Sequence, residues 1–172
     1  LIAEAWQRRS FELSAQTPTA TPTDDPYRYS DPITDHNEAL ARSLSRFPSG
    51  VQVTASEVRL VMASEGDAWR QNESPGVLDH VPMWIVGVTA DDLLIADVLS
   101  EYHMTNDGPD AFGSAPVEGA WYAWDANSGA ILGQGVLGPS WSQTMASLAQ
   151  LPDRWGTLSI VPATVWARSL DD

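Results

Sequence analysis

Residues 119–138 read GAWYAWDANSGAILGQGVLG, and the fold prediction starts from this stretch. Its first part is aromatic, which is typical of strands, and residues 125–129 are rich in Asp, Asn and Gly, which tolerate the left-handed backbone of turns. An apolar pattern resumes at 130–137. The sequence therefore predicts a β-hairpin with a loop of about five residues. Because successive side chains of a strand alternate between faces, Tyr122 and Trp124 share one face, and Trp121, Ala123 and Asp125 share the other.

The segment from Trp124 to Gly129, followed by Ile-Leu-Gly at 131–133, resembles the second hairpin of PepSY-type and related cystatin-like extracytoplasmic modules. In those modules an aromatic strand, an Asp-x-x-(Thr/Ser)-Gly turn and a closing strand recur. Residues 81–88 (VPMWIVGV) are similar to the strand that precedes this hairpin. The Glu or Lys that commonly follows the turn glycine is replaced here by Ala130. The resemblance implies a cystatin-like fold and a role in the cell envelope, in modulating a protein or peptidase or in sensing, and it implies no catalytic residue.

The composition excludes several classes of function. The chain has 172 residues, which fits one domain with a tail, and its formal net charge is −14, from 23 acidic and 9 basic residues. All the basic residues are arginines, and phosphate binding depends on clustered Lys and Arg, so we expect no nucleic-acid partner. An anionic membrane surface is disfavoured for the same reason. The absence of cysteine excludes a disulfide framework, thiolate catalysis and Cys-ligated zinc.

The first 32 residues differ in character from the rest. Residues 1–16 form a short helix at most, and residues 17–32 (TPTATPTDDPYRYSDP) alternate Pro and Thr, which favours extended chain. We predict an N-terminal tail and Thr/Pro-rich linker over residues 1–32 and a single domain over 33–172; the alternative is a terminus that packs along this domain. We expect a secretion signal or anchor upstream of Leu1, an extracytoplasmic location, and membrane contact only through that anchor.

The clearest predicted helix covers residues 33–47. Thr34 or Asp35 caps its start, and Asp35-x-x-Glu38 has the spacing of a capping box. The apolar face of this helix consists of three residues at helical spacing, Leu40, Leu44 and Phe47.

Strands are predicted at 51–54, 57–62 and 81–90, and the last of these is central because it is continuously apolar. Residues 65–76 predict a polar loop. Residues 91–102 favour a short helix, although the same run can form a further strand.

Residues 105–118 predict an exposed loop before the hairpin. After the hairpin, a helix is predicted from Ser140, which caps it, to Leu151. Residues 157–161 and 164–168 predict a final pair of strands or one kinked strand. The order of elements predicts an α+β fold, in which an antiparallel β-sheet is curled around an α-helix in the cystatin-like manner, with an additional C-terminal helix and strand.

No motif in the sequence identifies a catalytic, cofactor or metal site. His36, His80 and His103 are far apart and no His-Glu-x-x-His occurs, so surface or loop histidines are a better interpretation than zinc ligands. Asp125, Asn127 and Gly129 match part of a calcium loop, but the twelfth position is no carboxylate and a hairpin turn fits better. A Ser/His/Asp triad or a carboxylate pair assembled in space stays open. We predict no enzyme activity, no cofactor and no metal.

The eight tryptophans are spread over every predicted element, so core packing explains most of them. Tyr122 and Trp124 are the predicted contact residues, because their exposure would create an apolar patch of the kind that marks a partner. The leading hypothesis is a non-catalytic extracytoplasmic domain that binds a protein or peptide through its sheet face or hairpin loop. The alternatives are a hydrolase with a carboxylate/His site, and a carbohydrate- or ligand-binding module that uses exposed tryptophan.

Overall fold

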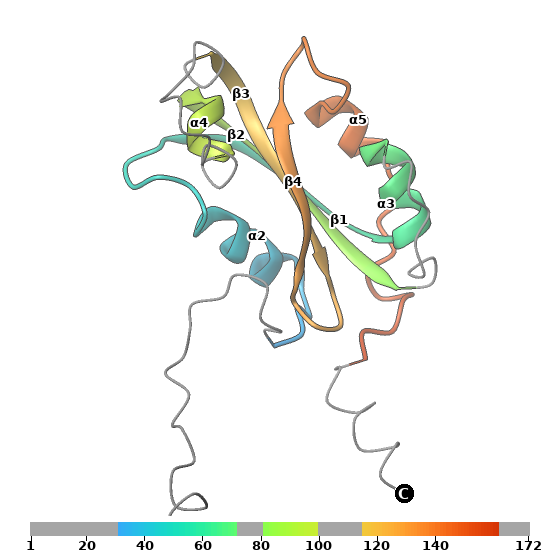
Figure 1. Cartoon of the computed structure of the whole chain (residues 1–172). Helices are drawn as coiled ribbons and strands as arrows, with labels where there is room; N and C mark the ends of the chain where they lie inside the picture. Colours follow the sequence, from blue (N-terminus) through green and yellow to red (C-terminus); the bar gives the residue numbers. More distant parts are fainter. Residues whose placement is uncertain (1–30, 72–80, 100–114, 162–172) are drawn as a thin grey trace, which may run out of the picture.

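The computed structural model describes residues 31–71, 81–99 and 115–161. Its centre is a four-stranded antiparallel sheet with the order β1-β2-β3-β4. The strands are β1 (Val53–Met62), β2 (Pro82–Leu94), β3 (Pro116–Asp125) and β4 (Ile131–Leu137). Figure 1 shows the sheet edge-on, with β4 in front and helices on both sides. The predicted α+β class with an antiparallel sheet is therefore confirmed.

The two central strands carry the most buried sequence. Residues 82–88 of β2 and residues 119–124 of β3 are buried throughout, because each strand has a neighbour on both sides and helices over both faces. The central strand predicted at 81–90 is confirmed. The hairpin predicted at 119–138 is also confirmed, as β3 and β4 joined by a short turn.

α2 (His36–Leu44) covers one face of the sheet. Asp35 caps it as predicted, since its carboxylate accepts from the N–H of Glu38 at 2.9 Å. The Glu38 carboxylate reaches back to the N–H of Thr34 at 3.0 Å. The three predicted apolar residues, Leu40, Leu44 and Phe47, are half-buried and pack against the core on this face.

The opposite face is covered by α3 (Ala63–Arg70) and α5 (Met145–Ala149) (Figure 1). The polar loop predicted at 65–76 is therefore wrong over its first half, and the rest lies outside the described residues. The buried side of α3 consists of the small residues Ala63 and Gly66. This helix consequently lacks the large apolar stripe by which a surface helix is recognised in a sequence.

The stretch predicted as helix or strand at 91–102 is divided between both states. β2 continues to Leu94, and α4 (Ile95–Val98) follows directly. The Asp97 carboxylate accepts from the N–H of Leu94 at 2.9 Å, which caps this short helix. Residues 100–102 lie outside the described residues.

The second predicted helix is shorter than expected. α5 begins after Thr144, whose hydroxyl accepts from the N–H of Ser147 at 3.1 Å. Ser140, the predicted cap, lies in a turn ahead of the helix. In this turn the N–H of Trp141 donates to the carbonyl of Gly138 at 3.0 Å, which ends the strand without starting a helix.

The strand predicted at 157–161 is wrong. The N–H groups of Thr157 and Leu158 both donate to the carbonyl of Arg154, at 2.9 and 3.1 Å, so the chain forms a turn that cannot extend a sheet. The strand predicted at 164–168 lies outside the described residues.

The predicted tail and linker lie outside the described residues, apart from Asp31 and Pro32. Among the helices that the structure describes, none is both long enough and apolar enough to cross a membrane.

Candidate functional site

The two predicted contact residues lie in the core. Tyr122 is 1% exposed and Trp124 is 7% exposed, and both lie on the sheet face beneath α2. The Trp124 Nε1 donates to the Ser43 hydroxyl at 3.0 Å. The ring of Phe47 packs edge-on against Tyr122, with centroids 6.0 Å apart. Their role in contacting a partner stays a prediction, and the side chains that line a surface hollow lie elsewhere.

His36 is the one histidine within the described ranges, and it pairs with a carboxylate. Its Nε2 lies 2.8 Å from the Oδ2 of Asp153. The imidazole is held edge-on between Trp84 and Trp155, with ring centroids 5.0 Å apart in both cases. This arrangement is the carboxylate–imidazole pair that a hydrolase would require.

The hydrogen bonds of Asp153 indicate that its pair with His36 holds the C-terminal segment against β1. Its Oδ1 accepts from the N–H of Leu60 at 3.2 Å and from the N–H of Trp155 at 3.1 Å, while Oδ2 faces His36. Burial opposes the ionisation of this carboxyl, but the hydrogen bonds from His36, Trp155 and Leu60 outweigh it and lower its pKa. No hydroxyl of the described residues hydrogen-bonds to His36.

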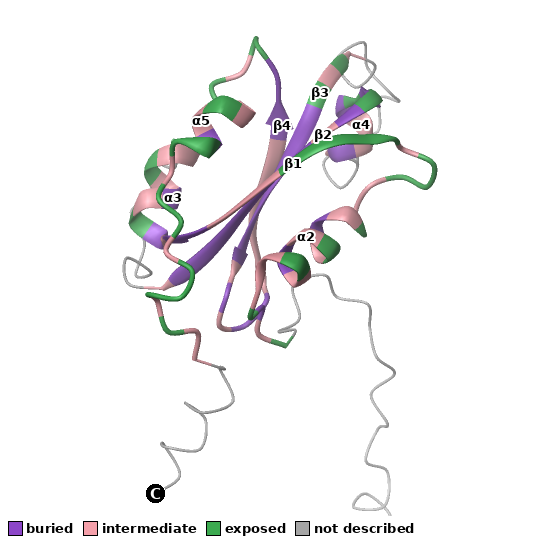
Figure 2. Ribbon diagram, turned by 180° about the vertical axis from the view of Figure 1, so that it is seen from behind, coloured by how far each residue is buried: buried purple, intermediate pink, exposed green. Residues whose placement is uncertain are grey.

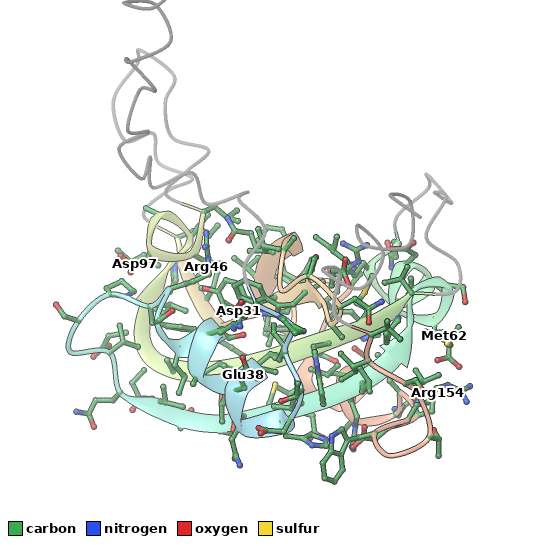
Figure 3. All side chains as sticks on the ribbon, turned by 90° about the horizontal axis from the view of Figure 1, so that it is seen from below. Asp31, Glu38, Arg46, Met62, Asp97 and Arg154 are labelled. Atoms are coloured by element: carbon green, nitrogen blue, oxygen red, sulfur yellow. The ribbon has the colours of Figure 1, made fainter. Side chains whose placement is uncertain are left out.

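Residues 152–161, here called the C-terminal strap, are fixed to β1 at a second point. The N–H of Arg154 donates to the carbonyl of Leu60 at 2.7 Å. The Arg154 guanidinium forms two bonds to the Glu65 carboxylate, which also accepts from the N–H of Met62 at 2.9 Å. Figure 3 shows Arg154 and Met62 at the same end of the molecule. The hydrogen bond from Arg154 lowers the pKa of Glu65, although burial opposes this change.

The turn that matches part of a calcium loop is filled by its own hydrogen bonds. The Asp125 carboxylate accepts from the N–H of Asn127 at 2.8 Å and from the hydroxyl of Ser128 at 2.7 Å. The side-chain oxygen of Asn127 accepts from the N–H of Val161 at 2.7 Å. Within the parts of the chain that the structure describes, no group of three or more His, Asp or Glu side chains is arranged to hold a metal ion.

A hollow of about 290 Å³ lies against the outer edge of β4 and is the strongest candidate for a binding site. We call it the β4-edge site. Its lining combines two indoles, two carboxamides and three small or apolar residues: Trp121 and Trp141, Gln134 and Gln143, and Leu99, Gly135 and Val136. A second hollow, of about 280 Å³, shares Trp141 and lies beyond the end of β4.

Trp121 reaches this site because glycines flank it on both neighbouring strands. It pairs with Gly87 on β2 and with Gly135 on β4. A Cβ on Gly135 would come within 2.5 Å of the Trp121 Nε1, and a Cβ on Gly133 would lie 3.5 Å from the far end of the ring. The indole therefore lies across the two glycines of β4, with its N–H edge at the β4-edge site. Only 8% of the residue is exposed.

Two polar atoms of the β4-edge site have no hydrogen-bond partner among the described residues. One is the Trp121 Nε1, and the other is the Gln134 Oε1, which is buried. The indole N–H groups of four other tryptophans donate to acceptors within the protein: Trp69, Trp84, Trp124 and Trp155. A buried polar atom without a partner costs about 1–3 kcal/mol. The Trp121 N–H, beside Gly135, is thus a donor without a partner at the hollow, whereas the Gln134 Oε1 is enclosed and would reach a ligand only if the carboxamide turned.

One of the residues that line the two hollows is charged. Glu118 is exposed and lies in the second hollow. It forms no ion pair with any described residue. The Arg70–Asp67 ion pair lies at the other end of β4, where Arg70 bonds to the carbonyl of Leu132. Within the described residues, the lining of the β4-edge site is therefore uncharged.

Sequence reasoning missed this site. It placed Trp121 on the opposite face from Tyr122 and Trp124, which is confirmed, but it assigned Trp121 no role. The available signal was Gly-Gln-Gly at 133–135, because two glycines on one face of a strand leave room for a large side chain from the next strand. No family model, curated protein or solved structure matches this chain. Function is therefore inferred from the geometry and chemistry of the site.

Proposed function

We propose that this chain is a non-catalytic binding domain whose ligand occupies the β4-edge site. The observation that carries the proposal is the indole N–H of Trp121, which has no acceptor among the described residues and belongs to a side chain that lines the hollow. A ligand with an acceptor would satisfy this N–H. The side chains of Leu99, Val136 and Trp141 would cover its apolar part.

A protein or peptide is the ligand class that we favour. The hairpin and the antiparallel sheet with α2 on one face agree with the resemblance to PepSY-like and cystatin-like modules. A sheet that curls around α2 in the cystatin-like manner, an extracytoplasmic location, and the modulation of a protein or peptidase are parts of the same proposal. They rest on the sequence resemblance, whereas the position of the site rests on the geometry.

Two other functions have weaker support. A hydrolase is favoured by the His36–Asp153 pair, but the hydrogen bonds of Asp153 serve to hold the C-terminal strap and no described hydroxyl bonds to His36. A carbohydrate-binding module would stack a sugar ring on an exposed indole face. The face of Trp121 instead covers Gly133 and Gly135, which leaves its N–H edge as the accessible part.

The proposal is tested by NMR titration of the ¹⁵N-labelled full chain with short peptides and, separately, with cellohexaose and chitohexaose. We expect at least one class to shift the indole N–H of Trp121 and the amides of Gln134 and Val136. The indole N–H signals of Trp84 and Trp124 serve as internal controls, because both groups are bonded within the core. Titrations in which Trp121 and Gln134 stay unchanged at millimolar ligand would show that the hollow is not a binding site.

The non-catalytic part of the proposal needs a separate assay. Ester, peptide and glycoside substrates incubated with the full chain and with His36→Ala should give the same background rates. Turnover that is lost in His36→Ala would instead favour the hydrolase.

A further inference from the structure

The outer edge of β4 offers main-chain groups as well as side chains. In an antiparallel sheet, the N–H and C=O groups of alternate residues point to one side of the strand, and those of the intervening residues point to the other. The N–H of Asp125 donates to the carbonyl of Ala130, so every second residue of β3 counted back from Asp125 bonds to β4. Within the hairpin, Ala123 and Trp121 therefore form their main-chain hydrogen bonds with Gly133 and Gly135. Gln134 and Val136 between them therefore direct their main-chain groups away from β3.

The open part of this edge has two defined ends. At its start, the carbonyl of Leu132 accepts from the Arg70 Nη1 at 3.0 Å, so Arg70 occupies the outward position before Gln134. At its other end, the chain turns away at Gly138, whose carbonyl accepts from the N–H of Trp141. Between these ends lie the outward groups of Gln134 and Val136, and both residues also line the β4-edge site. Gln134 is half-buried and Val136 is 4% exposed, so the main-chain groups of Gln134 are the more accessible.

We infer that the ligand is an extended peptide that pairs with β4 as an additional strand and places one apolar side chain between Trp121 and Trp141. This inference rests on the proposed function, because it names the ligand of the same site. Strand addition supplies donors and acceptors at the spacing of the outward groups of Gln134 and Val136, and pockets beside the edge select the side chains. The main chain of a peptide also carries an acceptor for the indole N–H of Trp121.

Charge selects the kind of peptide. The chain has a formal net charge of −14, and Glu118 is the one charged residue in the lining of the two hollows. A basic residue near the apolar one would lie against the Glu118 carboxylate, whereas an acidic peptide would be repelled by the whole domain. The partner is therefore a peptide segment with Lys or Arg close to its apolar residue.

The test uses the full chain and an acetylated and amidated peptide of alternating Thr and Val, with Leu, Phe or Trp at its centre and Lys two residues later. Two isomers of each peptide are N-methylated at alternate positions. Only one isomer keeps the N–H groups that face β4, so we expect one isomer to bind like the parent and the other to bind about tenfold more weakly or less. Replacement of the Lys by Glu should weaken binding about threefold or more at low salt.

A matched pair of variants tests the protein side. Gln134→Pro removes the outward N–H of β4 and leaves the bonds to β3 intact, and proline is tolerated at such edge positions. Ser56→Pro removes an outward N–H on β1. The N–H of Leu60 points away from β2, and since every second residue of a strand directs its main-chain groups to the same side, the N–H of Ser56 points away as well. We expect about a tenfold loss of affinity in Gln134→Pro and none in Ser56→Pro. The amide spectrum of each variant shows whether the sheet is intact, and the N-methylated peptides give the same information without any substitution.

The outcomes separate this inference from the proposed function. If both N-methylated isomers bind like the parent, or if Gln134→Pro binds normally, the peptide does not pair with β4 and the inference is wrong. If an oligosaccharide shifts Trp121 and no peptide does, the hollow is a binding site for another class of ligand. If neither class shifts Trp121, the inference and the proposed function are both wrong.

Discussion

The two edges of the sheet differ in what they leave open. On β1, residues 53–56 are exposed (Figure 2), Glu57 and Arg59 form an ion pair at 2.7 Å, and the C-terminal strap occupies both the N–H and the C=O of Leu60. β4 carries no charged residue, and a hollow lies beside its outward main-chain groups. Charged side chains and covering segments are the usual means by which proteins keep edge strands from pairing. β1 is therefore protected, whereas on β4, within the described residues, Arg70 covers Leu132, Val136 is buried, and the part around Gln134 between them is less protected.

This difference indicates where function lies. An unprotected edge favours aggregation, so a protein gains little stability from keeping one. The glycines of β4 are a further cost, because glycine weakens the interior of a strand. The compensation at Gly135 is the position of Trp121, whose Nε1 would be 2.5 Å from a Cβ at this residue. The features that weaken β4 as a strand are the features that form the site.

The largest expected effect is a loss of stability on substitution of Gly135 in β4. In Gly135→Ala the new Cβ would meet the Trp121 Nε1 at 2.5 Å, and a buried indole between packed strands has little freedom to move. We expect the free energy of unfolding in urea to fall by about 2–3 kcal/mol. Gly133→Ala is the matched control, since its Cβ would meet the flexible end of Arg70 and lies 3.5 Å from the indole. Its expected cost is about 1 kcal/mol or less. Equal costs at the two positions would mean that Trp121 does not lie across Gly135 as described.

The second effect comes from a substitution at Asp153 that uncovers the protected edge, β1. Asp153→Ala removes the acceptor for the N–H groups of Leu60 and Trp155 and the partner of His36. We expect a loss of about 1–2 kcal/mol in the free energy of unfolding, and faster hydrogen exchange at the Leu60 amide. Asp153→Asn keeps one oxygen for these amides and loses the carboxylate that pairs with His36, so it should retain most of the Leu60 protection. Unchanged exchange at Leu60 in Asp153→Ala would show that the strap does not protect β1.

The hairpin was predictable because its signals are local. The aromatic run, the Asp-Ala-Asn-Ser-Gly turn and the alternation of faces all lie within 119–138, and the capping of α2 by Asp35 is equally local. The buried positions of Tyr122 and Trp124 were not predictable in the same way. Alternation indicates which residues share a face, but the packing of α2 over that face depends on tertiary contacts.

The elements that sequence reasoning missed lack the signal on which it depends. α3 buries Ala63 and Gly66 against the sheet, so its composition is typical of a polar loop. Residues 157–161 of the C-terminal strap have an apolar pattern that predicts a strand; in the structure Leu158 and Ile160 pack on the core, and the main chain of the strap is held by Asp153 and Arg154 instead. The β4-edge site combines side chains from residues 99–143, and a hollow formed by such distant residues has no signature in sequence spacing.

A smaller effect concerns acid, which should act on the protected edge. The pKa of Glu65 is lowered in the folded chain by the hydrogen bond from Arg154. A carboxyl with a lowered folded-state pKa stabilises the fold above its unfolded pKa, near 4 for glutamate, and this stabilisation is lost as the pH falls through the folded value. We therefore expect the free energy of unfolding to decline as the pH falls below about 5. The decline should be shallower in Glu65→Gln and in Arg154→Gln, which removes the cause of the shift. A slope that neither variant changes would contradict the assigned role of this pair.

The smallest effect involves no change in stability and compares the indole N–H groups of the two faces. Those of Trp84 and Trp124 donate to the carbonyl of Ile33 and to the Ser43 hydroxyl, whereas that of Trp121 donates to no acceptor in the described residues. We expect the Trp121 indole proton to exchange with solvent at least about tenfold faster than the other two, although only 8% of Trp121 is exposed. Hydrogen-exchange NMR on the full chain measures this directly. A bound peptide should slow the exchange of the Trp121 indole proton alone, because it supplies the missing acceptor. If instead the Trp121 proton of the free chain exchanges as slowly as that of Trp124, its N–H is already satisfied and the open edge lacks its donor.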